Sequence, residues 1–243
     1  MPQADFCVSL ITPTYNEREN VSLLAEEIFG VLSERPDIDL ELIIVDDNSP
    51  DGTGQVAEAL KERFPVKVVH RAGKLGLGSA VMAGFAESDR PLLGVIDADL
   101  SHDPSILPEL IYGLARHDLA MGSRFGKTSE VEKWAVHRKM ISFVGVAFAR
   151  LITGVEDPLS GYFFLRREVI GSEFTLTSGG YKILLEILVK GNCQSHFSKP
   201  FVFRNRQFSA SKLNLREHIL FAKQIIVFGF HRLFSVRSKR LTK

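Results

Sequence analysis

The chain has 243 residues, of which 45% are hydrophobic and 24% charged, and its formal net charge is +1. That length allows one large α/β domain or two small ones, and we favour one because no Pro-, Ser- or Gly-rich linker divides the sequence. The near-neutral body argues against general nucleic-acid binding. Neither Cys7 nor Cys193 belongs to a metal or redox motif, so no oxidising compartment is required.

Charge is spread unevenly along the chain. Residues 212–243 hold eight Lys and Arg and one acid, a net +7, whereas residues 1–211 carry a net −6. Such a basic end suggests binding to an anionic surface. Because no signal peptide and no run of 18 uncharged apolar residues is present, we expect a cytoplasmic protein without a membrane span.

Strands and helices alternate in the first half of the chain. Short apolar strands are predicted at 8–12, 40–45 and 66–69, and a fourth ends at Asp97. Helical spacing follows at about 21–32, then up to about 63, and again after a glycine-rich turn at 73–78. Repeated β-α units with buried strands predict a mostly parallel, doubly wound sheet with helices on both faces.

The second half continues this order with longer polar connections. We predict a helix from 104 to about 116, a strand at 119–122, a polar loop at 124–137 and a helix at about 138–152. A strand near 162–165, a helix near 181–189 and a strand near 201–204 complete the body.

Two carboxylates, Asp97 and Asp99, stand at the end of the fourth strand. Ligands of open α/β sheets bind at the carboxyl ends of strands, and residues two apart in an extended chain point the same way. Both acids can therefore face one hard cation, which would in turn hold phosphate oxygens. A solvated turn is the alternative, since Asp is common in turns.

The glycine-rich turn at 73–78 does not complete a known phosphate motif. It has G-x-G without the third glycine and follows the third strand, which disfavours a dinucleotide fold, and Gly73-Lys74 lacks the earlier glycine of a P-loop. Two interpretations stay open: its backbone amides approach a ligand, or it is simply a turn.

Five segments, taken in order, resemble the inverting glycosyltransferases of family 2, and within them most closely the dolichyl- and polyprenyl-phosphate mannosyltransferases. They are 13–17 (PTYNE), 45–53 (VDDNSPDGT), 75–78 (LGLG), 97–99 (DAD) and 122–124 (GSR). Arg138 with Ser142, then 157–161 (DPLSG), and Arg206 with 211–213 (SKL) extend the resemblance to about residue 213.

The resemblance implies a GT-A fold in one catalytic domain at 1–211, with a nucleotide-binding half at about 1–100 and an acceptor half at about 101–211. Asp97, Asp99 and Ser101 would hold Mg²⁺ or Mn²⁺, and Asp97, Asp99, Arg124 and Arg206 would act in catalysis. The donor site would be lined by Pro13, Tyr15, Glu17, Val45, Asp47, Asp97, Ala98, Asp99, Arg124, Arg206 and Lys212. Helix capping before Gly52 is the alternative for Asp47, and surface solvation is the alternative for the cations.

The resemblance also assigns an acceptor site. Arg138 and Ser142, one helical turn apart, would bind the acceptor phosphate, with an exposed helix face as the alternative. A lipid monophosphate is already anionic at pH 7 and needs no general base. Polymerising members of the family carry a Gln-x-x-Arg-Trp motif that this sequence lacks. Ser101 stands where many members have a Gln ligand, so its contact with the metal would be direct or through water.

The basic tail at 212–243 has helical amphipathicity. Its apolar arc is formed by Ile219, Ala222, Ile225, Ile226, Gly229, Phe230 and Leu233. We expect a membrane-associating helix that holds the protein peripherally at the cytoplasmic leaflet. A terminal helix packed on the core, or a helix covered by a membrane partner subunit, are the alternatives.

Three functions are compared. The first is transfer of mannose from GDP-mannose to a dolichyl or polyprenyl phosphate with inversion. The second uses the same frame with a UDP-sugar such as UDP-glucose, and the third is nonenzymatic binding of a nucleotide sugar. Both carboxylates and every phosphate-facing cation are present, which argues against the third.

Overall fold

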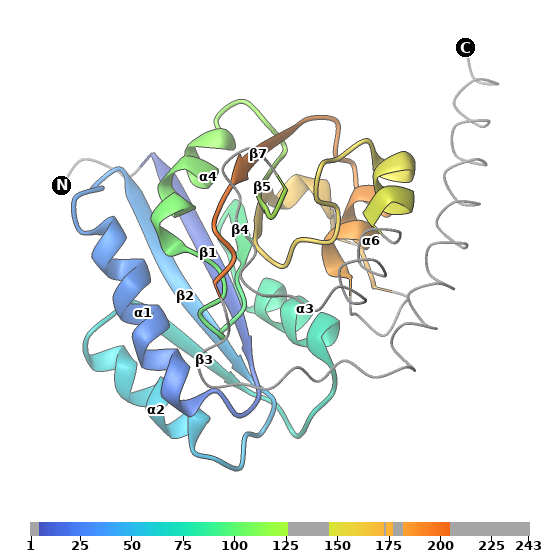
Figure 1. Cartoon of the computed structure of the whole chain (residues 1–243). Coiled ribbons are helices and arrows are strands. Elements are labelled where there is room, and N and C mark those ends of the chain that lie inside the picture. The colour runs from blue at the N-terminus through green and yellow to red at the C-terminus, as the bar shows by residue number, and fades with distance from the viewer. Residues whose placement is uncertain (1–4, 126–145, 173, 177–181, 205–243) are drawn as a thin grey trace.

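The computed structural model describes residues 5–125, 146–172, 174–176 and 182–204. Within them, seven strands form one sheet in the order β3-β2-β1-β4-β6-β5-β7 (Figure 1). The strands are β1 Phe6–Thr14, β2 Ile38–Asp46, β3 Val66–His70, β4 Leu92–Val95, β5 Leu119–Ser123, β6 Phe163–Arg166 and β7 His196–Pro200. The α-helices are α1 Arg18–Leu32, α2 Thr53–Ala59, α3 Leu77–Glu87, α4 Leu107–Gly113 and α6 Ile183–Lys190, and residues 146–153 are also helical.

Parallel pairing dominates the sheet, and β6 is the exception. β1 pairs in parallel with both β2 and β4, β2 with β3, and β5 with β7. β6 lies between β4 and β5 and runs antiparallel to both, with Val95 opposite Phe163. The start of β6 therefore lies beside the carboxyl end of β4.

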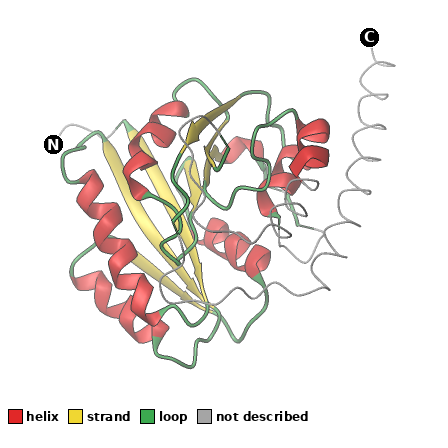
Figure 2. Cartoon of the chain, in the orientation of Figure 1, coloured by secondary structure: helices red, strands yellow, loops and turns green. Residues whose placement is uncertain are grey.

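The sheet is the middle of three layers (Figure 2). On one face, Val21, Leu24 and Ile28 of α1 pack with residues of α2 and α4 against β1 and β2. On the other face, α3 and α6 cover the sheet, with Phe85 and Ile187 buried. Strands that are buried on both faces explain why their sequences read as continuous apolar runs rather than as alternating ones.

The predicted fold class and most predicted elements are confirmed. Several ends differ. β1 and β2 are longer than predicted, and α2 stops at Ala59 and passes into a 3-10 turn at Leu60–Glu62. The helix predicted from 104 to about 116 is a 3-10 turn at Pro104–Ile106 followed by α4, and β4 stops at Val95, before the two carboxylates. The last predicted strand, at 201–204, is wrong: the strand is His196–Pro200, and the side chain of Phe201 packs into the core instead. The tail at 212–243 lies outside the described residues.

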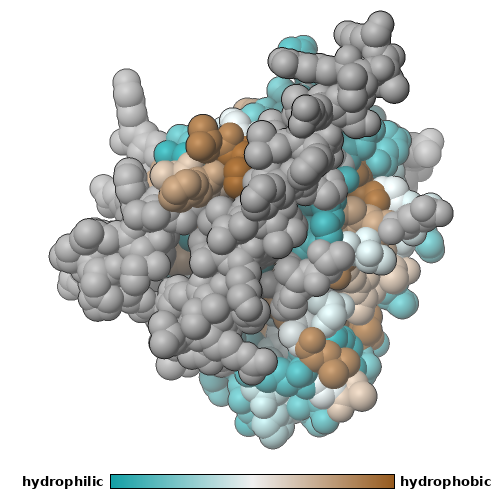
Figure 3. Space-filling view, turned by 90° about the vertical axis from the view of Figure 1, so that its right-hand side faces the viewer, coloured by the Kyte–Doolittle hydropathy of each residue, from teal (hydrophilic) through white to brown (hydrophobic). Residues whose placement is uncertain are grey.

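Apolar side chains are exposed at few places in the described part of the chain. Leu151 is 83% exposed, Leu75 62% and Phe148 55%. On the face that Figure 3 presents, hydrophobic residues gather in small groups between hydrophilic ones where described residues are visible. Within the described residues, no helix combines the length and apolar character needed to cross a bilayer.

Candidate active site

Three neighbouring strands deliver polar residues to one edge of the sheet. Since β1, β2 and β4 are parallel, the segments that follow Thr14, Asp46 and Val95 leave the sheet at the same end. The Ile96 amide donates to the Ile11 carbonyl at 3.1 Å, which keeps the chain beyond β4 against β1. This edge is where ligands of open α/β sheets bind.

The turn after β4 presents its two carboxylates differently. The Asp97 side chain is 34% exposed, whereas Asp99 is only 6% exposed. Asp99 Oδ1 accepts from the Ser101 amide at 3.1 Å and from the Ser101 hydroxyl at 2.5 Å. Ser101 thus supports Asp99, and its direct contact with a metal stays a prediction.

Leu100 is the residue that gives this turn its shape. Its φ is +60°, in the left-handed region that side chains other than Gly, Asn and Asp seldom adopt. The Leu100 side chain is nevertheless buried, in the core cluster that also contains residues of α1 and α4. Backbone strain of about 1–3 kcal/mol persists only where surrounding packing compensates it, and such strain concentrates at functional sites.

His102 connects this turn to an aromatic cluster. Its Nδ1 accepts from the Asp97 amide at 3.3 Å, and its Nε2 lies 3.9 Å from Asp97 Oδ2. The ring stacks on Tyr162, with centroids 5.3 Å apart, and meets Phe201 edge-on at 5.7 Å. Because His102 is 3% exposed, it is held rigidly and fixes the backbone that carries Asp97.

Gly161 leaves the space in which the Asp97 carboxylate lies. A Cβ at this position would come within 2.9 Å of Asp97 Oδ2 and 3.3 Å of His102 Cε1. Any side chain here would push the carboxylate aside, which gives the glycine of the 157–161 motif a physical reason.

Asp97 and Asp99 are the oxygen ligands that this turn could offer to a divalent cation. In the described part of the chain no group of three or more His, Cys, Asp and Glu side chains could hold a metal. The protein would therefore supply two carboxylates, Asp97 and Asp99, and a diphosphate and water would supply the rest. Mg²⁺ is bound in this way in nucleotide enzymes.

Asp47 braces the glycine-rich turn from inside. Its Oδ2 accepts from the Leu75 amide at 3.0 Å and from the Gly76 amide at 3.4 Å, and its Oδ1 lies 2.8 Å from Arg71 Nη1. Helix capping by Asp47 is not observed, because Asp51 Oδ1 accepts from the Thr53 amide at the start of α2. Two amides of the glycine-rich turn are therefore bonded to Asp47.

Asp51 joins the loops after β1 and β2. It accepts from the Arg18 amide at 3.2 Å, and the Thr53 hydroxyl in turn accepts from the Glu17 amide at 2.9 Å. Desolvation raises the pKa of Asp51. The hydrogen bonds from Thr53 and Arg18 together lower it by more, so the pKa lies below its ordinary value. Glu17, which is predicted to line the site for the nucleotide-sugar donor, is thereby held in place through its backbone amide.

Tyr15 is partly buried at the same edge. The Lys74 ammonium lies 4.4 Å from the centre of its ring, a cation–π contact. Pro13 and Val45 are register partners in β1 and β2. The side chains of Val45 and Ala98 belong to the core, so a donor contact by either residue, which stays a prediction, would have to use its backbone.

Arg124 forms a salt bridge with a buried acid. Its Nε and Nη2 lie 2.9 and 2.8 Å from the two carboxylate oxygens of Asp157, and its amide donates to the same group at 3.1 Å. Asp157 is fully buried and the Arg124 side chain is 14% exposed. This pair links β5 to the 157–161 motif, and a phosphate contact by Arg124 stays a prediction.

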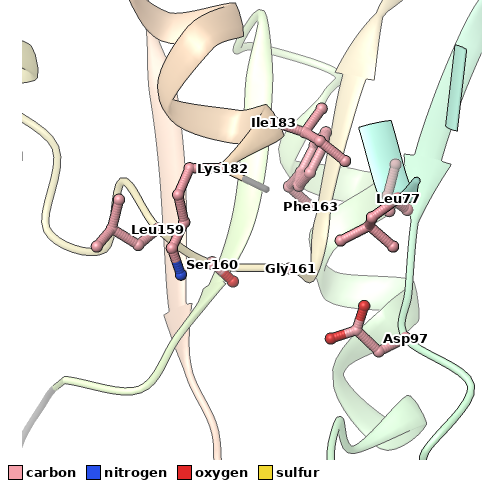
Figure 4. Close-up of a pocket in the computed structure, with 9 residues that line it drawn as sticks. Leu77, Asp97, Leu159, Ser160, Gly161, Phe163, Lys182 and Ile183 are labelled. Carbon is pink, nitrogen blue, oxygen red and sulfur yellow. The ribbon is translucent and has the colours of Figure 1, made fainter. Parts of the chain in front are cut away.

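A small pocket of about 30 Å³, partly open to solvent, lies beside Asp97 (Figure 4). Its walls come from the start of α3, the segment before β6 and the start of α6. They are formed by Leu77, Val95, Asp97, Leu159, Ser160, Gly161, Phe163, Lys182 and Ile183.

The other predicted site residues are not placed by the structure. Arg138 and Ser142 of the acceptor site, and Arg206 and Lys212 of the donor site, lie outside the described residues.

Sequence reasoning missed three residues at this edge: Arg71, His102 and Lys182. Arg71 follows β3 directly, so the strand-end rule that selected Asp97 would have selected it too. His102 and Lys182 carried no spacing signal, because packing brings them to Asp97 and to the pocket.

Comparison with known proteins places the chain in a family. The sequence profile described as "Glycosyl transferase family 2" matches residues 9–185. The chain is 42% identical to a dolichol-phosphate mannosyltransferase of Pyrococcus furiosus, over 85% of this chain and 59% of that protein, so it spans less than two thirds of this relative.

Other relatives are covered more completely. A dolichol-phosphate mannosyltransferase of Saccharomyces cerevisiae is 33% identical over 91% of this chain and 88% of its own length. A polyprenol monophosphomannose synthase of Mycolicibacterium smegmatis is 35% identical over 86% and 82%.

Solved structures share the fold. Glucosyl-3-phosphoglycerate synthase of Mycobacterium tuberculosis, in complex with Mn²⁺, UDP and glucosyl-3-phosphoglycerate, superposes with a TM-score of 0.67 over 93% of this chain and 80% of that one, at 21% identity. The chain belongs to glycosyl transferase family 2, in the group of dolichol-phosphate mannosyltransferases and polyprenol monophosphomannose synthases.

Proposed function

We propose that this chain transfers mannose from GDP-mannose to a dolichyl or polyprenyl phosphate, with inversion at the anomeric carbon. The observation that carries the proposal is identity of 33–42% over most of the chain with enzymes named for this acceptor and sugar. The strand-end placement of Asp97 and Asp99 supports it chemically.

The nucleotide would bind across the ends of β1 and β2. Tyr15 offers an aromatic face, and the loop that carries Glu17 is held by Thr53. Asp47 holds the glycine-rich turn and Arg71 in fixed positions, so this end of the site is organised before the donor arrives.

Asp97 and Asp99 would hold a divalent cation, Mg²⁺ or Mn²⁺, against the diphosphate. Bound there, the cation supplies neutralisation of the negative charge that grows on the leaving nucleoside diphosphate. The chain's own part is to fix the two carboxylates: Ser101 bonds to Asp99, His102 bonds to the Asp97 amide, and Gly161 keeps space for the Asp97 carboxylate.

Arg206 and Lys212 would add cationic contacts to the donor phosphates, and Arg138 with Ser142 would bind the acceptor phosphate. Because the acceptor oxygen is already ionised, the chain need not remove a proton from it.

The direct test compares donors on one protein preparation. With Mn²⁺ present, GDP-mannose should raise Tm while UDP-glucose and UDP-GlcNAc should not, and labelled mannose should appear in dolichyl phosphate. At a donor concentration of 100 Kd the stabilisation is about 2.7 kcal/mol, which a thermal shift detects readily. Stabilisation by a UDP-sugar alone would move the function to the second hypothesis, and donor binding without any transfer would favour the nonenzymatic one.

We further propose that residues 212–243 hold the protein at the cytoplasmic leaflet. Each basic residue near an anionic leaflet contributes about 1 kcal/mol, and burying a large apolar side chain contributes roughly 1.5–3 kcal/mol. High salt should therefore release the protein only partly and detergent fully. Phe148 and Leu151 expose further apolar surface on the helical segment at 146–153.

Flotation with anionic liposomes tests the tail. A chain truncated after Leu213 should stop floating yet keep donor binding and transfer poorly to membrane-embedded acceptor. If the truncated chain floats as well as the intact one, the tail is not the anchor. If it loses donor binding or unfolds, the terminal helix belongs to the core.

A further inference from the structure

The pocket beside Asp97 contains a cation that the sequence motifs do not explain. Lys182 extends from the start of α6 toward Ser160, and Asp97 lies on the other side of Gly161 (Figure 4). Of the described residues that line the pocket, Asp97 has the only acidic side chain and Lys182 the only cationic one.

The backbone of Lys182 is fixed relative to the sheet. It is the residue before α6, and its carbonyl accepts from the Glu186 amide at 3.3 Å. Ile183, Leu184 and Ile187 of α6 are buried in the core that also contains Val95 of β4. The start of the helix also carries partial positive charge, which adds to that of the ammonium.

The remaining walls offer little competition for an anion. The Ser160 hydroxyl donates to the Gly122 carbonyl at 2.7 Å and accepts from the Tyr162 amide at 3.1 Å, so it is already used in the protein. Leu77, Leu159 and Ile183 are apolar. An anion that enters this pocket would find its positive partner in Lys182.

The chemistry of the proposed function, on which this inference rests, orients the pocket. In an inverting transfer the attacking oxygen approaches the anomeric carbon from the side opposite the leaving group. Asp97 marks the side of the metal and the diphosphate, and Lys182 stands across the pocket from it. Lys182 therefore faces the side from which the acceptor attacks.

We propose that Lys182 binds the phosphate of the acceptor and positions its attacking oxygen. A lone pair of that ionised oxygen forms the new bond to the anomeric carbon, while the bond to the diphosphate breaks and its electron pair leaves with the nucleoside diphosphate. No proton is transferred at the acceptor oxygen. A lysine here selects phosphate monoesters, because a hydroxyl acceptor needs a base and Lys182 is a cation.

The test compares Lys182→Ala and Lys182→Arg with Lys61→Ala, which removes an exposed lysine paired with Glu58. A short-chain polyprenyl phosphate in detergent serves as acceptor, so that membrane binding plays no part. Lys182→Ala should lower kcat/KM for the acceptor about 10- to 100-fold, the effect of one charge-assisted hydrogen bond, and leave KM for GDP-mannose within about 2-fold. Lys182→Arg should recover most of the loss, and Lys61→Ala should match the wild type.

A second measurement separates binding from folding. Titration calorimetry of the same lipid phosphate in the presence of GDP and Mn²⁺ should show weaker binding to Lys182→Ala, with unchanged Tm. Equal acceptor affinity in Lys182→Ala and wild type, or an equal rise in both KM values, would overturn the assignment. Absence of transfer by the wild type would instead overturn the proposed function.

Discussion

Acidic residues stand at both ends of the candidate site, and the protein uses them in opposite ways. At the nucleotide end, Asp47 is 7% exposed in its side chain and is bonded to two backbone amides and Arg71. At the transfer end, Asp97 has a side chain that is 34% exposed and lines a pocket. Asp47 therefore braces a loop, whereas Asp97 faces the pocket; Asp99, 6% exposed and bonded to Ser101, is held like Asp47.

The difference teaches how far a motif describes a function. Both sets follow parallel strands, so the strand-end rule predicts both equally well. Burial separates Asp47 from Asp97, because a buried carboxylate is stable only when paired and hydrogen-bonded, whereas a partly exposed one can exchange its water for a metal. The comparison makes four predictions, from the largest expected effect to the smallest.

Removing either carboxylate at the transfer end should nearly abolish sugar transfer. Asp97→Ala or Asp99→Ala should lower transfer at least about 1,000-fold, since a metal's stabilisation of the leaving group is worth several kcal/mol. Ser101→Ala should keep measurable activity, because it removes only a support of Asp99. Initial rates with and without EDTA measure this. Full activity in EDTA, or a wild-type rate in either Asp variant, would refute the metal assignment.

The salt bridge between Arg124 and Asp157 should matter for folding. Asp157→Ala leaves a mostly buried guanidinium without its carboxylate and should cost about 3 kcal/mol in the free energy of unfolding. Urea denaturation measures it, with Asp39→Ala, which removes the acid of a more exposed pair, as the control. A loss below about 1 kcal/mol would indicate that Arg124 readily turns to solvent or a phosphate.

The nucleotide end should respond through donor affinity. Asp47→Asn keeps one oxygen acceptor but loses the charge opposite Arg71, so the glycine-rich turn loosens. KM for GDP-mannose should rise about 10-fold while KM for the acceptor stays constant, the scale of one weakened charge-assisted contact. If both constants rise together, Asp47 supports the whole site rather than its nucleotide end.

The protein should lose stability gradually in acid, because the hydrogen bonds that Asp118 and Asp51 accept are stronger while these carboxylates are ionised. Desolvation raises the pKa of Asp118, but amide hydrogen bonds from Gln194 and Ser195 outweigh it and place the pKa below the ordinary 3.8. The pKa of Asp51 is lowered in the same way. A lowered folded-state pKa means that this stability is complete above the unfolded value and is lost as pH falls through the folded one.

Urea midpoints measured from pH 6 down to pH 3 check this. The urea concentration at the wild-type midpoint should decrease once the pH is lowered below about 4, where unfolded aspartates begin to bind protons. The fall should be smaller in Asp118→Asn, which has no carboxylate to protonate. Parallel curves for the two proteins would exclude Asp118 as a source of the acid sensitivity.

Much of the fold could be predicted because its strands are buried on both faces. The apolar runs of β1 and β2, two central strands, follow directly from that burial. β7 could not be predicted, because it lies at the edge of the sheet and its residues are partly exposed. The apolar Phe201, which follows it and packs into the core, led to the wrong prediction of a strand at 201–204.

The candidate site was predictable where chemistry sits at strand ends. Asp97 and Asp99 were found because two acids closing an apolar run are conspicuous. His102 was not, because its function depends on stacking against Tyr162, 60 positions along the chain. Lys182 was not, because only the packing of α6 brings it to the pocket.

The long segment between β4 and its partner β6 has a consequence for the order in which the strands fold. The register that places Phe163 opposite Val95 closes a loop made of the whole segment 96–162, whereas β1, β2 and β3 follow one another closely in the chain. Loop closure over a long segment is entropically costly and slow, and domains emerge N-terminus first during synthesis. The nucleotide end can therefore form while the protein is still being made, and the pocket that joins Asp97 to Lys182 forms only after the later strands have docked.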